Sequence, residues 1–399
     1  MTRAVQPLCI FLALIFLVTT VVGHVSAEGI KVGVILPLTG KLSKLGKIEQ
    51  DSFLMAADEI NKAGGINGKK VDLIIEDTTG NPDVGRLVIE KLISKDGVCV
   101  LGGAYSSSVA WAALPVAQHR KVPFLVNTAS ADKITEQGWG YIFRLNPPAS
   151  EYPRALASFL TKEVHIKTVA ILHENTLFGQ SGSRKFARQC EKDLDLKVVI
   201  KESYERGTLD FESLLLKVKT RKPDLIYMIS HVMDASFLMQ QAKELNLNPK
   251  IFVGGSAGLT LPEFQGIAGD ASEYVFSGTL WTASVIYPGA KDYYDKFVGK
   301  YDSPPEYHGA QAYAAMYVIA DALKRATSLT PKAVRDALTE TDMMTIFGPV
   351  KFVSYGKKAQ QNNFPTLLGQ WVNGRFEAVW PRQLATVKYV YPVPKWNER

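Results

Sequence analysis

Short apolar runs alternate with longer amphipathic segments along the chain. The first run, residues 30–36, is rich in β-branched side chains, which suits a strand buried on both faces of a parallel sheet. Pro37 and Gly40 interrupt it, and an amphipathic helix is predicted over 46–63. Gly64 and Gly65 follow this segment, as is usual beyond a helix C-terminus.

The same unit recurs up to about residue 130. Further strands are predicted at 71–75, 98–101 and 122–126, with helices at 82–95 and 106–118. The helix at 82–95 opens with Asn81 as N-cap and Pro82 at the first helical position. Regular strand–helix alternation predicts a parallel sheet covered by helices on both faces.

The strand–helix alternation is interrupted at 144–148, and a second block of similar size begins after it. Its predicted strands are 168–173, 197–200, 225–229 and 251–253, and its predicted helices are 150–163, 179–192, 211–219 and 234–245. The two blocks share an architecture without a close sequence repeat. The pattern therefore predicts an α/β protein with two Rossmann-like lobes, each a parallel sheet flanked by helices.

The remaining part of the chain is less regular. An extended connector is predicted at 276–281, followed by helices at 289–301, 307–326 and 331–339. Strand-like pieces follow from residue 347 onward. Asn373-Gly374 stands between two apolar runs, which predicts a β-hairpin.

The N-terminus has the pattern of a secretory signal peptide. Arg3 precedes an apolar run at 8–22, and Val25 and Ala27 supply small residues before a cleavage point after Ala27. An uncleaved anchor helix is the alternative, but the run is shorter than the ~20 residues that a membrane span needs. Residues 1–27 are therefore expected to direct export to the periplasm and then to be removed.

Composition and charge narrow the possible partners. The chain has 399 residues, enough for more than one domain, and its 46% hydrophobic and 21% charged residues are typical of a folded soluble protein. The formal net charge is +7, and it falls to +6 without Arg3, the one charged residue before Glu28. Because the basic residues are scattered, no nucleic-acid partner is expected, although a modest positive field favours anionic ligands.

Neither a cofactor nor catalysis is expected. There is no Walker loop, no GxSxG elbow and no GxGxxG after the first strand. Six histidines without HxxH or CxxC spacing give no basis for a metal site. Cys9 would leave with the signal peptide, and Cys99 and Cys190 are expected to be free thiols because they fall in different predicted lobes.

Several short motifs, in order along the chain, carry a family resemblance. They are IKVGVILPLTG at 30–40, AADEIN at 56–61, AGGI at 63–66 with Gly68, Glu76-Asp77, Gly102-Gly103 with the serines 106–108, VPF at 122–124, Phe178-Gly179 and AQAY at 310–313. Together they cover most of the chain after residue 28. The sequence resembles the class I periplasmic substrate-binding proteins of branched-chain amino-acid and amide ABC importers, of the Leu/Ile/Val-binding type.

This resemblance implies two discontinuous lobes joined by a three-stranded hinge. The N-terminal lobe would comprise 28–146 and 280–358, and the C-terminal lobe 147–279 and 359–399, with crossings near Asn146, near Thr279 and within 357–364. It also implies a non-enzymatic protein that closes on a small ligand and delivers it to the membrane permease of an ABC importer. The alternative is a stand-alone sensing domain of the same fold for amides or amino-acid derivatives.

The ligand is expected at the carboxyl ends of the sheet strands. The strand at 98–101 leads through Gly102, Gly103 and Tyr105 to a helix that begins near Ser106. A helix N-terminus presents free N–H groups and partial positive charge, which can bind a carboxylate. The alternative is that Ser106 or Ser107 only caps the helix, but the resemblance places the family's carboxylate-binding serine at Ser106.

Further site residues come from other strand ends. The resemblance assigns to Ala129 a carbonyl for a ligand amine and to Ser130 a hydroxyl and an N–H for the carboxylate, although the proline that the family commonly has in this loop is missing. Phe178 would pack on the ligand. His231 follows the strand at 225–229 and is expected to be a neutral hydrogen-bonding residue rather than a metal ligand.

One departure from the family concerns the ligand's amino group. Amino-acid binders have an acid near Ser256 to pair with the ammonium, and the nearest acids here, Asp234 and Glu263, are out of register. A desolvated ammonium without a carboxylate partner costs several kcal/mol. Either another acid supplies the charge, or the ligand has no ammonium. The second option favours a carboxylate with an apolar or aromatic body.

Two aromatic residues, Trp281 and Tyr307, would suit such a ligand body. Packing in the core is the alternative for both. The ligand is thus expected to be an amino acid or another small carboxylate, aromatic or aliphatic.

Overall fold

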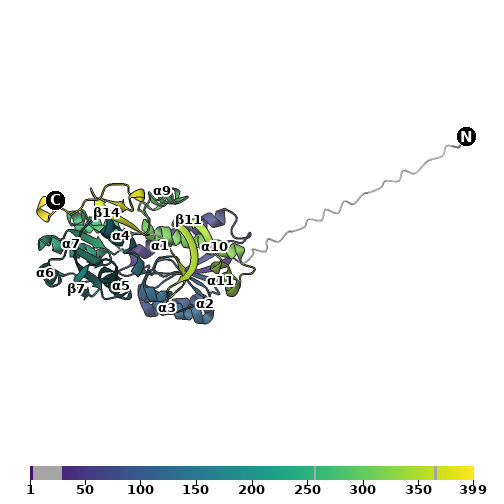
Figure 1. The fold of residues 1–399 in the computed structure, drawn as a ribbon. Coiled ribbons are helices and arrows are strands. Elements are labelled where there is room, and N and C mark those ends of the chain that lie inside the picture. Colours follow the sequence, from purple (N-terminus) through teal and green to yellow (C-terminus); the bar gives the residue numbers. More distant parts are fainter. Residues whose placement is uncertain (3–28, 256–257, 364–365) are drawn as a thin grey trace.

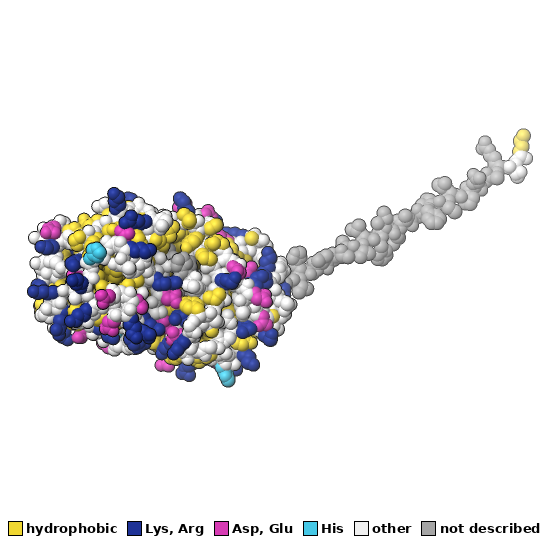
Figure 2. Space-filling view, in the orientation of Figure 1, with side chains coloured by type: hydrophobic (Ala, Val, Ile, Leu, Met, Phe, Trp, Pro, Cys, Tyr) yellow, Lys and Arg dark blue, Asp and Glu magenta, His cyan; other side chains and the backbone are white. Residues whose placement is uncertain are grey.

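The computed structural model describes residues 1–2, 29–255, 258–363 and 366–399. Two α/β lobes lie side by side, each built on its own sheet, and this confirms the predicted fold class (Figure 1). On the face shown in Figure 2, Lys and Arg side chains are scattered among acidic ones.

The first sheet has eight strands, most of them parallel. In spatial order they are β11 (Asp342–Thr345), β12 (Gly348–Tyr355), β13 (Lys358–Asn362), β5 (Ile142–Arg144), β4 (Phe124–Val126), β3 (Val100–Gly103), β1 (Ile30–Leu36) and β2 (Val71–Asp77). The pairs from β13 to β2 are parallel, and β11, β12 and β13 pair antiparallel at one edge.

The second sheet has seven strands. Their order is β15 (Arg375–Trp380), β14 (Leu367–Val372), β10 (Phe276–Thr279), β9 (Ile251–Gly254), β8 (Leu225–Ile229), β6 (Thr168–Glu174) and β7 (Lys197–Tyr204). From β10 to β7 the strands are parallel, and β14 and β15 add an antiparallel edge.

Helices cover both faces of the first sheet. They are α1 (Ser43–Lys62), α2 (Pro82–Ser94), α3 (Ser107–Arg120), α9 (Ala290–Tyr301), α10 (Glu306–Arg325) and α11 (Pro331–Thr339). Val32 and Val34 of β1 point into the core beneath α1 and α10, whereas Ile35 points to the opposite core beneath α2 and α3. This alternation follows from the two-residue period of a strand.

The second lobe carries the remaining helices. They are α4 (Arg154–Lys162), α5 (Leu177–Asp193), α6 (Glu212–Arg221), α7 (Val232–Glu244) and α8 (Pro262–Ala268), and the 3-10 turns of the chain are η1 (Asp132–Ile134), η2 (Ala149–Glu151), η3 (Gly269–Ser272), η4 (Arg382–Leu384) and η5 (Trp396–Glu398). The helix predicted over 150–163 is shorter than expected, because Pro153 lacks an N–H and α4 begins after it.

The chain passes between the sheets three times. It leaves the first sheet after β5, returns after β10, and leaves again after β13. Because β13 pairs with β5 and β12, it lies in the first sheet, so the chain leaves that sheet after Asn362 rather than at the expected boundary of 358. This last crossing includes residues 364–365, which lie outside the described part of the chain.

Two local predictions had different outcomes. Asn373 and Gly374, with φ of 53° and 69°, form the turn of the β14–β15 hairpin, as predicted. The segment expected to be a connector at 276–281 instead begins with β10, which pairs with β9 on one side and β14 on the other. This strand contains Ser277 and Gly278 and therefore does not appear as an apolar run in the sequence.

Cys99 and Cys190 are both buried and unpaired, as expected. Across the described ranges, none of the helices combines the length and the apolar character that crossing a membrane requires.

Candidate ligand-binding site

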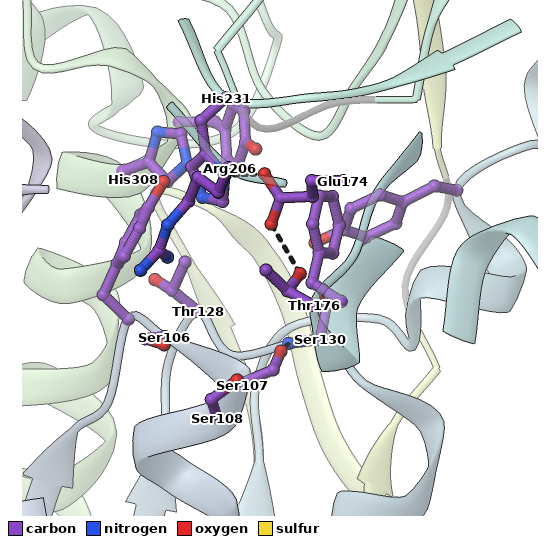
Figure 3. A pocket seen from close by; sticks show the side chains of 14 residues that line it. Ser106, Ser107, Ser108, Thr128, Ser130, Glu174, Thr176, Arg206, His231 and His308 are labelled. Carbon is purple, nitrogen blue, oxygen red and sulfur yellow. Dashed lines mark hydrogen bonds and ion pairs between the residues drawn. The ribbon is translucent and has the colours of Figure 1, made fainter. Parts of the chain in front are cut away.

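A cavity of about 430 Å³, counting the part open to solvent, is lined from both lobes (Figure 3). The carboxyl ends of β3, β4, β6, β7 and β8 all lead to lining residues, as expected for parallel sheets. The lining residues are Tyr105, Ser106, Ser107, Ser108, Thr128, Ser130, Tyr152, Glu174, Thr176, Phe178, Arg206, His231, Tyr307 and His308.

The N-terminus of α3 forms one side of this pocket. Gly103, with φ of 102°, makes the tight turn out of β3, and a Cβ there would lie 2.4 Å from the Ile35 carbonyl oxygen. Ser106 is the N-cap, and its hydroxyl oxygen accepts a long hydrogen bond of 3.5 Å from the Val109 N–H. The N–H groups of Ser107 and Ser108, in the first turn, have no carbonyl partner within a helix.

The Ser107 hydroxyl, expected to bind the ligand, holds a neighbouring loop. Ser107 Oγ accepts hydrogen bonds from the backbone N–H groups of Ser130 and Ala131, at 3.2 and 3.1 Å, and so ties the loop after β4 to α3. The N–H of Ser130, which the family resemblance assigns to a ligand carboxylate, therefore already has a partner. The Ser130 hydroxyl still faces the pocket.

A buried carboxyl group lies directly behind this side of the pocket. Thr128 Oγ1 donates to Glu49 Oε1 at 2.7 Å, and Asn127 Nδ2 donates to Glu49 Oε2 at 2.9 Å. Burial raises the pKa of Glu49 to about 7, against the opposing effect of these two hydrogen bonds. Glu49 is fully buried in α1 and does not line the pocket.

The opposite side of the pocket carries charged side chains. Glu174 ends β6, is fully buried, and accepts from Thr176 Oγ1 and from His231 Nδ1, both at 2.5 Å. Burial alone would raise the pKa of Glu174, but the His231 charge and the hydrogen bonds from His231 and Thr176 lower it. Because the ionised carboxylate can only accept, Nδ1 of His231 carries the proton.

Arg206 adds a cation to this side. It follows β7 in a loop, is half-buried, and extends into the pocket (Figure 3). None of the residues that the structure describes forms an ion pair or a hydrogen bond with its guanidinium group.

Rings close the remaining sides. The Phe178 ring meets His231 edge-on at 5.8 Å between centroids, and Tyr307 stacks on His308 at 3.8 Å. Burial and the nearby His231 lower the pKa of His308 to about 3, so its ring is neutral. Within the described ranges, the Tyr105 hydroxyl and His308 Nδ1 are buried without a hydrogen-bond partner. Such orphaned groups are rare, and a bound polar ligand would satisfy them.

Most of the expected site residues meet in this pocket. Those that line it are Tyr105, Ser106, Ser107, Ser130, Phe178, His231 and Tyr307. Ala129 is buried beside Ser130 but is not among the lining residues, and Ser256 lies outside the described residues.

Trp281 does not line this pocket. Its indole N–H donates to the Ile346 carbonyl at 2.9 Å, and its ring packs edge-on against Tyr293. These contacts direct the side chain to a second cavity, which it lines together with Glu306 and Trp371.

The sequence left open whether another acid supplies the charge for a ligand ammonium, and the structure places one acid, Glu174, among the lining residues. Of the two acids considered from sequence, Asp234 accepts from the Gly207 N–H and Glu263 pairs with Lys44 at 2.9 Å, and neither lines the pocket. Glu174 and Arg206 were both missed, although each lies at or just beyond the end of a parallel strand, which was the rule used for the other site residues.

Two lobes around a pocket that contains a helix N-terminus, an arginine and unsatisfied polar groups define a ligand-binding protein of the two-lobed, hinged class. The chain belongs to the periplasmic binding protein family, whose sequence model matches residues 29–375. Members of this family are non-enzymatic solute-binding proteins.

Individual relatives agree with this assignment. The chain is 29% identical to the "Leu/Ile/Val-binding protein homolog 7" of Brucella suis over 374 residues, which cover 89% of this chain and 92% of the relative. A branched-chain amino acid transporter substrate-binding protein from Streptococcus pneumoniae, solved with isoleucine, has a TM-score of 0.80 at 23% identity, covering 89% of this chain and 100% of its own. An ABC transporter solute-binding protein from R. palustris, solved with benzoate, has a TM-score of 0.78 at 19% identity, covering 92% and 97%.

Proposed function

We propose that this protein captures a small carboxylate-bearing ligand between its lobes and delivers it to the membrane permease of an ABC importer. The observation that carries this proposal is the N-terminus of α3 in a pocket lined from both lobes. There, first-turn N–H groups, the Ser106 hydroxyl and the orphaned Tyr105 hydroxyl are all placed to donate to an anion.

Closure of the lobes would complete the site. Ser181 of α5 and Asp132 of η1 meet across the cleft: the Ser181 hydroxyl donates to Asp132 Oδ1 at 3.0 Å, and the Asp132 N–H donates to Ser181 Oγ at 3.1 Å. The ion pair between Lys44 and Glu263 also joins the lobes. A ligand that touches both walls adds contacts available only in this arrangement, and so shifts a hinge equilibrium toward it.

The similar structures support both ligand classes that the sequence leaves open. One was solved with isoleucine, which carries an ammonium group, and another with benzoate, which does not. An amino acid and an aromatic or aliphatic carboxylate are therefore both compatible with the fold.

Transport is favoured over the sensing alternative because these structural neighbours belong to ABC transporters. Family membership implies a periplasmic location. Export would use residues 1–27 as a cleaved signal peptide, of which residues 3–27 lie outside the described part of the chain.

A thermal-shift screen with amino acids and with aromatic and aliphatic carboxylates tests the proposal, followed by titration calorimetry on the best probe. Ser106→Ala should weaken binding of that probe by ~1–3 kcal/mol, since it removes a charge-assisted hydrogen bond. The control is Ser94→Ala, which removes an exposed hydroxyl that bonds only to the Glu90 carbonyl of its own helix. If no carboxylate raises the melting temperature, or if both variants bind like the wild type, the proposal fails.

A further inference from the structure

Arg206 lines the pocket, and its guanidinium group forms no ion pair or hydrogen bond with any residue that the structure describes. The loop that carries it starts directly after β7, and Tyr204, the last residue of that strand, is fixed by a hydrogen bond from its hydroxyl to Ser230 Oγ at 2.5 Å. The base of the loop is therefore held, while the side chain of the half-buried Arg206 extends into the cavity (Figure 3). A partly buried arginine that forms no ion pair can bind an anionic group of a ligand.

Glu174 does not fill that role. It is the one acid among the lining residues, and both of its oxygens are engaged, Oε1 by Thr176 and Oε2 by His231. Neither oxygen forms an ion pair with Arg206 among the contacts of the described residues.

The same two hydrogen bonds disfavour a ligand ammonium. An α-amino acid would bring a second unpaired cation into a pocket that already holds Arg206, and the acid that could receive it is committed to His231 and Thr176. The carboxylate of either kind of ligand can pair with Arg206, but the ammonium group of a zwitterion needs an acid of its own. Desolvating an ammonium without a carboxylate partner is costly.

We propose that Arg206 is a specificity-determining residue that binds the ligand's carboxylate from the second lobe and selects monoanionic carboxylates without an ammonium group over zwitterionic amino acids. This inference rests on the proposed function and narrows its ligand class. A guanidinium group binds a carboxylate through two parallel N–H···O bonds, which the N-terminus of α3 can supplement from the other lobe.

Pairs of probes that differ only in the ammonium group test this inference. They are 3-phenylpropionate with L-phenylalanine, and 4-methylpentanoate with L-leucine, each titrated by calorimetry into wild type, Arg206→Gln and Arg206→Lys. Wild type should bind at least one of the deaminated acids more than ~10-fold tighter than its amino-acid partner. Arg206→Gln should weaken that acid by ~10- to 100-fold and remove most of the preference, as for a lost charge-assisted pair.

Arg206→Lys should retain part of the preference, because it keeps the charge and loses the bidentate geometry. The matched control is Arg188→Gln, which removes the same charge from the exposed surface of α5 and should leave both affinities unchanged if Arg206 acts by direct contact. The melting temperature of each variant without probe reports whether it folds.

The possible failures are distinguishable. If amino acids bind wild type as tightly as the deaminated acids, or if Arg206→Gln leaves the preference intact, the role of Arg206 is wrong while carboxylate binding stands. If neither member of any pair binds wild type, carboxylate capture itself is refuted.

Discussion

The two walls of the pocket differ in how they are built. The first-lobe wall presents uncharged donors: the first turn of α3, the hydroxyl of Ser106 and the phenol of Tyr105. The second-lobe wall presents the charged groups Glu174 and Arg206 together with His231.

Each wall is associated with a buried carboxyl group, and burial has opposite outcomes there. Glu49, behind Thr128, is surrounded by an amide and a hydroxyl, and its pKa rises to about 7. Glu174 accepts two short hydrogen bonds, from His231 and Thr176, and lies near the Arg206 charge, and its pKa falls. The comparison shows that a charged partner, and not burial as such, decides whether a buried acid stays ionised. The first wall can therefore hold any carboxylate, while the second sets what else the ligand carries.

Removing Glu174 should have the largest effect on this comparison. Glu174→Ala leaves His231 and Thr176 without their partner and should lower the free energy of unfolding by ~3 kcal/mol, as when one member of a buried ion pair is deleted. Urea denaturation at pH 7 measures this.

The control for Glu174→Ala is Asp270→Ala, which removes the partner of Lys243 from an ion pair at the surface and should change little. Because the pKa of folded Glu174 lies below its ordinary value, its stabilisation is present above that ordinary value and is lost as the pH falls through the folded pKa. A deficit that does not shrink in acid would contradict the ion-pair account.

Replacing Glu49 should instead raise the free energy of unfolding near neutral pH. A raised pKa means that the folded state prefers the protonated carboxyl, so the contribution of Glu49 to stability is greatest below pH 4.5 and falls as the pH rises toward 7. In Glu49→Gln the new amide can donate to Asn127 Oδ1, which has no partner among the described residues, once the Asn127 amide rotates. The variant should gain on wild type by about 2 kcal/mol in unfolding free energy between pH 5 and pH 8. A gap that is independent of pH would show that Glu49 is not the titrating group.

Cutting the contact between the walls should give the smallest effect. Ser181→Ala removes both hydrogen bonds to Asp132 and should weaken binding of a carboxylate probe by about 5-fold, because closure loses a contact. Ser183→Ala in the same helix removes a hydroxyl that bonds only to the Gln180 carbonyl, and it should bind normally. Small-angle scattering without ligand should show a more open average shape for Ser181→Ala alone.

The sequence predicted most of the fold because most strands are buried on both faces and read as apolar runs. β7 is the exception, and its end was predicted too early, so Arg206 in the loop that follows was not recognised as a site residue. It is an edge strand, so its last residues, 201–204, are mostly polar, and the apolar pattern stopped at Ile200. Glu174 was missed for a similar reason, since the strand was expected to end at His173 and not at this acid.

The first-lobe side of the site was easier to predict than the second. Gly103 and Ser106 stand in a strand–turn–helix pattern whose geometry follows from local chemistry. The pairing of Glu174 with His231 joins residues that lie far apart in the chain, and the turning of Trp281 away from the pocket depends on the Ile346 carbonyl. Neither contact can be derived from local pattern.

A crystal structure with a carboxylate from the screen bound tests the central claim most directly. The account predicts the carboxylate between the lobes, with its oxygens within ~3 Å of the Ser106 hydroxyl and the first-turn N–H groups of α3. A ligand that occupies the pocket with no acidic group at that helix end, or that binds elsewhere on the protein, would contradict it.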